Sequence, residues 1–208
     1  MLKKISEQGL QKANNWFTAN SLLMNKDKTN SIVFSSNKSH IKGISLKYLG
    51  IFLDDRRSWN DHINYLQKVL SKSIFVLRTL KKVLSLDTLR SSYFALFHSH
   101  LTYGAVLWGN SCQAERIFIL QKRAIRVIMG ASYREHCQPL FVQLHIMPLP
   151  CVFIYASLLE VHKQKDHLAV GADFHEYDTR YSTAVRQPFY RLNKSVKNSS
   201  RIDLYNCH

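Results

Sequence analysis

Two adjacent carboxylates, Asp54 and Asp55, are the residues of this sequence that most resemble a catalytic pair. They follow the apolar run 48–53, at the end of a segment with strand character. Paired aspartates at a strand end can hold divalent metal ions, but such a site needs a third carboxylate from an earlier strand. Upstream, the acidic residues are Glu7 and Asp27, and neither ends an apolar strand. We therefore do not expect this pair to be catalytic.

The histidines and cysteines do not form a metal-binding motif. His98 and His100 are two residues apart, roughly 200° around a helix, so they point to different faces. His136 and Cys137 are adjacent, and no C-x-x-C or H-x₃₋₅-H pair completes a zinc site. A nucleophilic Cys–His arrangement is left open, although no signature supports it. The four cysteines have no regular spacing and no signal peptide precedes them, so we expect reduced intracellular thiols.

The charge balance is strongly basic. The chain has 29 lysines and arginines against 14 acidic residues, for a net charge of +15. Between residues 56 and 134 there are thirteen basic residues and three acidic ones. This excess indicates nucleic acid or another anionic surface as the partner, with a merely basic solvated surface as the alternative. No run reaches the ~18 apolar residues of a membrane span, so we expect no membrane insertion.

The N-terminal part predicts one helix and one pair of strands. Apolar residues recur at helical spacing over residues 3–20. Residues 31–34 have strand character, the polar segment 37–42 predicts a hairpin loop, and residues 44–53 predict the return strand. Gly50 predicts a tight bend or a bulge within that second strand.

The middle of the chain predicts helices with basic faces. Asn60 or Asp61 is the expected N-cap of the first helix, whose leucines keep heptad spacing broken only by Ser73. Ser85 predicts the start of the second helix, and residues 113–129 predict the third. The positions expected to form the core are Ile63, Leu66, Leu70, Leu77, Leu80, Leu84, Leu89, Tyr93, Leu96, Phe97, Leu101, Ala114, Ile117, Phe118, Ala124, Ile125 and Ile128.

Prolines delimit the helices toward the C-terminus. Pro139 is the expected first residue of a helix that ends near His145. After Pro148 and Pro150, residues 152–162 predict a further helix. The remainder is polar, with no sustained period. The fold class is therefore mainly α with a small β portion.

Several ordered segments resemble the reverse transcriptases of jockey-like non-LTR retrotransposons, from the end of the palm through the thumb and the C-terminal extension. The resemblance covers nearly the whole chain. It is carried by Trp16-Phe17, Asn20, Leu22, Asn25, Lys28-Thr29 and Phe34, then by KYLGIFLD (47–54) with Trp59 and His62-Ile63, YFALFHSHLTYGAVLWGN (93–110), RIFILQKRAIRVIMG (116–130), REHCQPLF (134–141), HEYDTR (175–180), PFYRLNKS (188–195) and DLYN (203–206).

The resemblance implies four regions. Residues 1–58 correspond to the end of the palm with a primer-grip-like hairpin, and residues 59–131 to a helical thumb. Residues 132–164 form further helices, and residues 165–208 an irregular extension. In such enzymes palm aspartates hold two divalent metals, usually Mg²⁺. Those aspartates are expected upstream of Met1, so this chain is expected to hold no cofactor and to be inactive alone.

The resemblance also implies roles for particular residues. Lys28, in the N-x-x-K-T element, matches a palm lysine near the incoming nucleotide. Tyr48, Leu49 and Gly50 match the hairpin that holds the primer end. The residues expected to contact the backbone of the RNA template and of an RNA–DNA or DNA duplex are Lys68, Lys72, Arg116, Lys122, Arg123 and Arg126. For Lys28 a solvated loop lysine, and for Gly50 a purely structural bend, are the alternatives.

Two other functions are compatible with the sequence. The chain is either a decayed reading frame without a selected function, or a helical module that a host reuses to bind a protein through the face of Ile63, Leu66 and Leu70. The sequence favours no oligomeric state and leaves nucleus and cytoplasm open as locations.

Overall fold

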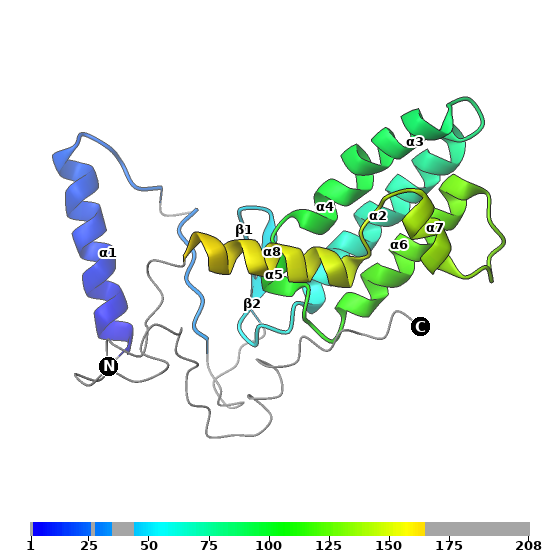
Figure 1. Cartoon of the computed structure of the whole chain (residues 1–208). Coiled ribbons are helices and arrows are strands. Elements are labelled where there is room, and N and C mark those ends of the chain that lie inside the picture. Colours follow the sequence, from blue (N-terminus) through cyan, green and yellow to red (C-terminus); the bar gives the residue numbers. More distant parts are fainter. Residues whose placement is uncertain (1, 26–27, 35–43, 165–208) are drawn as a thin grey trace, which may run out of the picture.

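The computed structural model describes residues 2–25, 28–34 and 44–164, and this part of the chain is mainly helical with a small antiparallel sheet (Figure 1). Helix α1 (Leu2–Ala19) stands apart from the other helices, and its apolar residues Ile5, Leu10 and Trp16 are exposed. The later helices pack together into a bundle, with the two strands at one end. The expected fold class, mainly α with a small β portion, is confirmed.

The sheet differs from its prediction. Strands β1 (Ser45–Tyr48) and β2 (Ile51–Asp54) form a hairpin in which Tyr48 pairs with Ile51. Leu49 and Gly50, the two residues between them, both have positive φ (46° and 82°), the signature of a type I′ turn. The prediction of one continuous strand over 44–53 was therefore wrong. Of the two alternatives at Gly50, a tight bend or a bulge, the structure has the tight bend, as the turn between two strands.

The expected partner strand is also absent where it was predicted. Residues 31–34 are described and form no strand, while the predicted loop 37–42 lies outside the described residues. The strand-like composition of 31–34 is not sufficient, because the two-residue turn lets β2 pair with its immediate neighbour in sequence at a small loop-closure cost.

The start of α2 (Asn60–Leu80) is fixed by a residue of β2 and not by the predicted caps Asn60 or Asp61. The N-cap position is Trp59, in a left-handed conformation and without a side-chain cap. The Asp54 carboxylate accepts hydrogen bonds from the backbone N–H of Ser58 at 2.8 Å and of Trp59 at 3.4 Å, and from the Ser58 hydroxyl. A negative charge at this end also complements the helix dipole.

The core lies between α2, α6 (Ala114–Met129) and a third, irregular column of helix. That column consists of α3 (Leu86–Tyr93), a π-helical turn η2 (Phe94–His98), α4 (Ser99–Thr102) and α5 (Ala105–Trp108). Most of the predicted core positions are buried, and Trp108, which the prediction omitted, is fully buried.

The π turn explains one wrong core assignment. Leu96 was expected to be buried but is 37% exposed, because the extra residue in the π turn rotates it away from the core. The Leu96 carbonyl instead faces α2, where the Ser73 hydroxyl donates to it at 2.8 Å. Ser73 therefore interrupts the leucine heptad for a reason: it supplies a donor where the π turn presents a carbonyl.

Two further helices cover the bundle. Helix α7 (Cys137–Gln143) begins two residues before Pro139, so the predicted start was slightly late. Helix α8 (Leu149–Lys163) begins after Pro148 and is longer than the predicted 152–162. No helix in the described part is long and apolar enough to cross a membrane.

Candidate nucleic-acid interface

Helices α2 and α6 lie side by side and run in the same direction (Figure 1). Near their beginnings, Arg116 Nη1 of α6 donates to Asn64 Oδ1 of α2 at 3.2 Å. Near their ends, the ammonium group of Lys81 lies against Gly130, so that a side chain added at Gly130 would collide with it. The two helices are therefore parallel neighbours along their length.

Four of the six predicted backbone contacts are exposed on these helices. Lys68 and Lys72 are one turn apart on α2, and Arg116 and Arg123 are two turns apart on α6. None of the four has an ion-pair partner among the described residues. Their charges are therefore available to an anionic ligand.

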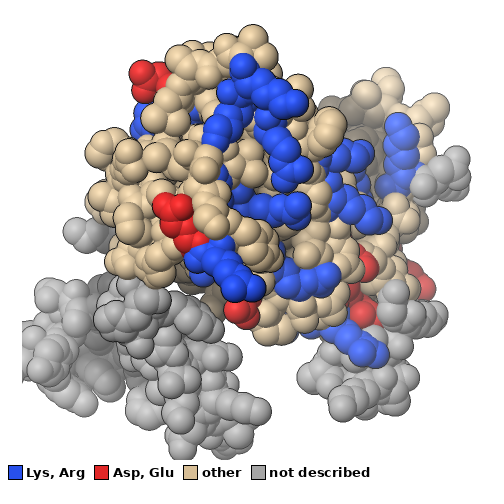
Figure 2. Space-filling view, turned by 90° about the vertical axis from the view of Figure 1, so that its right-hand side faces the viewer, with Lys and Arg blue, Asp and Glu red and all other residues tan. Residues whose placement is uncertain are grey.

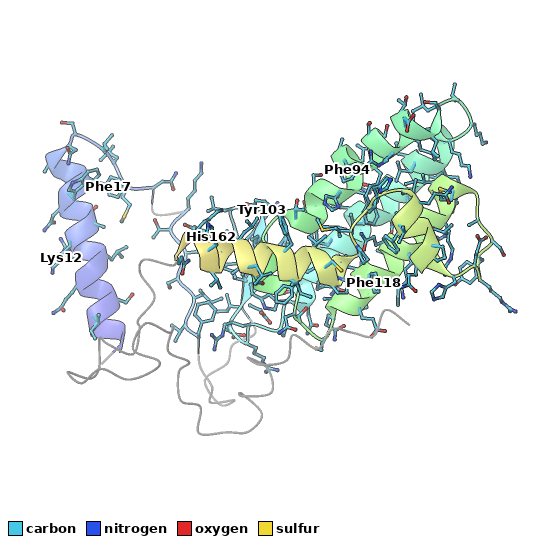
Figure 3. The ribbon with its side chains drawn as sticks, viewed as in Figure 1. Lys12, Phe17, Phe94, Tyr103, Phe118 and His162 are labelled. Carbon is cyan, nitrogen blue, oxygen red and sulfur yellow. The ribbon has the colours of Figure 1, made fainter. Side chains whose placement is uncertain are left out.

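The other two, Lys122 and Arg126, are half-buried and their side chains already contact neighbouring groups. The Lys122 ammonium lies 4.2 Å from the centroid of the Phe118 ring, whose position on α6 is visible in Figure 3. Arg126 Nε donates to the Glu135 carbonyl at 2.9 Å. The six predicted residues thus form two groups, and this second group is less free to contact a ligand.

The prediction missed a group of basic residues at the C-terminal end of α2 and just after α6. We call it the basic end; its members are Arg78, Lys81, Lys82 and Arg134. Figure 2 shows this end of the bundle, where lysine and arginine side chains gather across the face with fewer acidic side chains among them. In the sequence, the two adjacent lysines after Leu80 could have indicated this group. They are an ambiguous signal, because cations at a helix C-terminus also stabilise the helix dipole.

The predicted primer-grip residues lie at the opposite end of α2. Tyr48 and Leu49 are 65% and 71% exposed at the tip of the hairpin. The Tyr103 hydroxyl donates to the Leu49 carbonyl and holds this tip against the bundle, and Figure 3 shows Tyr103 beside the hairpin. Because α2 has 21 residues, the hairpin and the basic end are separated by about 30 Å.

Lys28 lies in a tight turn organised by Asn25. The Asn25 side chain accepts a hydrogen bond from the Lys28 backbone N–H at 3.1 Å, and the backbone carbonyl of Asn25 accepts one from the Thr29 hydroxyl at 2.8 Å. The N-x-x-K-T spacing therefore has a local structural cause, because Asn25 accepts hydrogen bonds from both Lys28 and Thr29. The turn leaves the Lys28 side chain exposed.

Asp54 and Asp55 do not fit a metal centre. Both oxygens of Asp54 accept hydrogen bonds from the loop before α2, and Asp55 is 5% exposed. Within the described residues, no three histidine, cysteine or acidic side chains are placed to hold a metal ion. Asp54 instead has a structural task, since it holds the loop that leads into α2.

Cys137 does not have the environment of a nucleophile. Burial raises the pKa of its thiol, although the charges of Arg126 and Lys122 oppose this effect. Its Sγ lies 3.8 Å from the Lys122 carbonyl and 3.9 Å from the Glu135 carbonyl, within reach of a weak S–H donor. A protonated thiol is a poor nucleophile.

The face proposed for a protein partner is not on the surface. Ile63 and Leu70 are completely buried and Leu66 is 3% exposed, all within the core of the bundle. That expectation was wrong because the heptad spacing marks the side of α2 that packs on α6 and the irregular column.

The chain matches no family model, no curated protein and no solved structure in the comparisons made with each.

Proposed function

We propose that this chain is a C-terminal part of a reverse transcriptase of the non-LTR type and that its helical bundle holds a template–primer duplex by the phosphate backbone. The observation that carries the proposal is the exposed basic residues of the neighbouring helices α2 and α6: Lys68, Lys72, Arg116 and Arg123 have no carboxylate partners among the described residues. The residue order that resembles such enzymes supports the same assignment.

Binding of this kind is electrostatic and does not read sequence. Each lysine or arginine that neutralises a phosphate releases condensed counterions, and this release drives association. The exposed residues of α2 and α6 and those of the basic end contribute most, because their charges are not engaged. Lys122 and Arg126 contribute less, since each already contacts a neighbouring group. The hairpin residues Tyr48, Leu49 and Gly50 then contact the primer end.

The chain itself catalyses nothing in this proposal. Its Asp54 carboxylate is used in the fold, at the start of α2. Polymerisation would depend on Mg²⁺ held by palm aspartates in another part of an intact enzyme. The role of this part is to position the duplex.

The test is fluorescence-anisotropy titration of the full chain with a labelled RNA–DNA hybrid across a range of salt concentrations. We expect affinity to fall steeply with salt and little with sequence. The double variant Lys72→Gln/Arg78→Gln should reduce the slope of log affinity against log salt by about 0.9 for each phosphate that is no longer neutralised.

A matched control removes the same charge elsewhere. Lys12→Gln/Lys163→Gln changes two exposed lysines, one on α1 and one at the end of α8, and should leave the slope nearly unchanged. Absence of binding at low salt by the folded chain would overturn the proposal. Equal effects of the two double variants would show that net charge, and not this surface, is responsible.

A further inference from the structure

Ser85 is an exposed serine in the loop that joins α2 to α3, beside the lysines of the basic end. This loop lies at the end of α2 that is remote from the hairpin (Figure 1). The backbone N–H groups of Val83 and Leu84 both donate to the Leu80 carbonyl, at 3.0 and 2.9 Å, and close the loop into a tight turn. The Ser85 hydroxyl is therefore within one compact turn of the exposed Lys82.

The residues around Ser85 have the charge pattern of a kinase substrate. Two adjacent lysines precede it by four and three residues, and Leu86 follows it. Kinases select substrates largely by such patterns, and the basophilic class selects a basic residue three positions before the serine. Ser6 and Ser71 also have a lysine at that position, but each lies within a helix. Ser85 precedes α3 with an extended backbone (φ −65°, ψ 161°), so this serine is the more accessible acceptor.

A phosphate on Ser85 is compatible with the fold. The Ser85 hydroxyl lies 3.0 Å from the Thr88 hydroxyl and accepts the Thr88 backbone N–H at 3.5 Å. Phosphate oxygens are strong acceptors and can replace the hydroxyl in this contact. Asp87 already places one negative charge in the first turn of α3. The modification therefore changes the charge of this end of the molecule without removing the start of a helix.

We propose that Ser85 is a phosphorylation site and that its phosphate weakens duplex binding at the basic end. Ser85 Oγ attacks the γ-phosphorus of ATP, a new O–P bond forms, ADP leaves with the β–γ bridging oxygen, and the hydroxyl proton passes to a carboxylate base of the kinase. A phosphoserine carries a charge of about −2 at neutral pH. It offsets the charges of Lys81 and Lys82, which otherwise neutralise phosphates of the duplex.

This inference rests on the proposed function, because it describes how that function is regulated. The first experiment separates charge from capping. Ser85→Asp and Ser85→Asn both supply a good N-cap and differ in charge. At about 0.15 M salt we expect Ser85→Asp to bind the labelled RNA–DNA hybrid about fivefold more weakly than Ser85→Asn, the effect of one lost phosphate contact. Ser6→Asp adds the same charge at an exposed position of α1 and should have little effect.

The second experiment uses the modification itself. The full chain is incubated with ATP and a basophilic serine kinase, and mass spectrometry locates the phosphate. We expect phosphate on Ser85 and a lower rate of its addition in Lys81→Gln/Lys82→Gln. In the phosphorylated chain the slope of log affinity against log salt should be smaller by up to about 1.8, as for two lost phosphate contacts. Circular dichroism establishes that each variant is folded.

Absence of phosphate on Ser85 after this treatment would overturn the site. If Ser85→Asp and the phosphorylated chain bind the hybrid as tightly as Ser85→Asn, the regulation is overturned and the duplex-binding function stands. Failure of the unmodified chain to bind at low salt would overturn both. Equal weakening by Ser6→Asp and Ser85→Asp would mean that net charge is responsible, and would overturn the role of the basic end. If Ser85→Asp does not fold, the phosphorylated chain decides the question.

Discussion

At the scale of single residues, Gln121 joins more of the bundle than any basic residue does. It is completely buried on α6, and its Nε2 donates to the Tyr93 hydroxyl at 3.0 Å and to the Met147 carbonyl at 2.9 Å. Its Oε1 accepts from the Leu149 N–H at 2.7 Å. One amide therefore connects the irregular column, α6 and the start of α8, and it has partners for every group that burial removed from water.

Replacement of Gln121 by leucine should be strongly destabilising. The change leaves the Tyr93 hydroxyl and the Leu149 N–H buried without the Gln121 partner, and each such group costs about 1–3 kcal/mol. We expect the free energy of unfolding to fall by about 3 kcal/mol, measured by urea unfolding. Gln143→Leu is the control, since Gln143 is exposed and its change should stay within about 0.5 kcal/mol. Similar losses for both variants would contradict this account.

Two histidines should make the fold sensitive to acid. Burial lowers the pKa of both His62 and His98 below the ordinary value of 6.5. As pH falls through about 6.5 the unfolded chain therefore binds protons that the folded chain does not, so stability decreases. We expect the urea midpoint to decrease from about pH 7.5 to about pH 5.5, and His98→Gln to show a smaller decrease. A midpoint that rises on acidification would show that other groups dominate.

At the scale of elements, the hairpin turn contains a residue that is poorly suited to it. A type I′ turn favours Asn-Gly, whereas here Leu49 occupies the first position with φ of 46°. Leu49→Asn should therefore raise the free energy of unfolding by about 0.5 kcal/mol, and Gly50→Ala should lower it by about 1 kcal/mol. Thermal or urea unfolding of the two variants measures this. A loss of stability in Leu49→Asn would mean that the exposed leucine side chain makes contacts that outweigh its backbone strain.

Elements set by local sequence were predictable, and those set by distant hydrogen bonds were not. The helix predicted over 113–129 is α6, and Ser85 is the N-cap of α3, where its hydroxyl accepts from the Thr88 N–H. By contrast, the loop that leads into α2 is held by Asp54 on a strand, and the register of the irregular column depends on a π turn that Ser73 supports from another helix. The spacing of apolar residues in the sequence does not reveal those contacts between distant elements.

The candidate site follows the same division. Lys68, Lys72, Arg116 and Arg123 were predictable as exposed because they lie opposite apolar helix faces. The engagement of Arg126 was not, since it depends on where the chain after α6 brings the Glu135 carbonyl. The burial of His62 was also missed: in the sequence His62 is only a polar residue in the first turn of a helix, and its burial requires β2 to pack across it.

At the scale of the whole molecule, the two ends of α2 have different tasks. In the proposed function, the hairpin at its start receives the end of a strand, and the basic end, about 30 Å away, holds backbone phosphates. B-form DNA rises by about 3.4 Å per base pair and an RNA–DNA hybrid by less, so roughly nine base pairs or somewhat more are needed to reach both regions. Shorter duplexes can contact one region but not the two together.

Affinity should therefore increase with duplex length up to roughly nine base pairs and then level off, apart from the statistical gain of additional positions. Competition binding with a series of hybrids from about five to about fifteen base pairs measures this at one fixed salt concentration. The variant Arg78→Gln/Lys82→Gln removes charge from the basic end, so it should weaken the long hybrids and leave the shortest nearly unchanged. Equal weakening at every length would mean that a short duplex already reaches the basic end, and the hairpin would then not determine where the duplex begins.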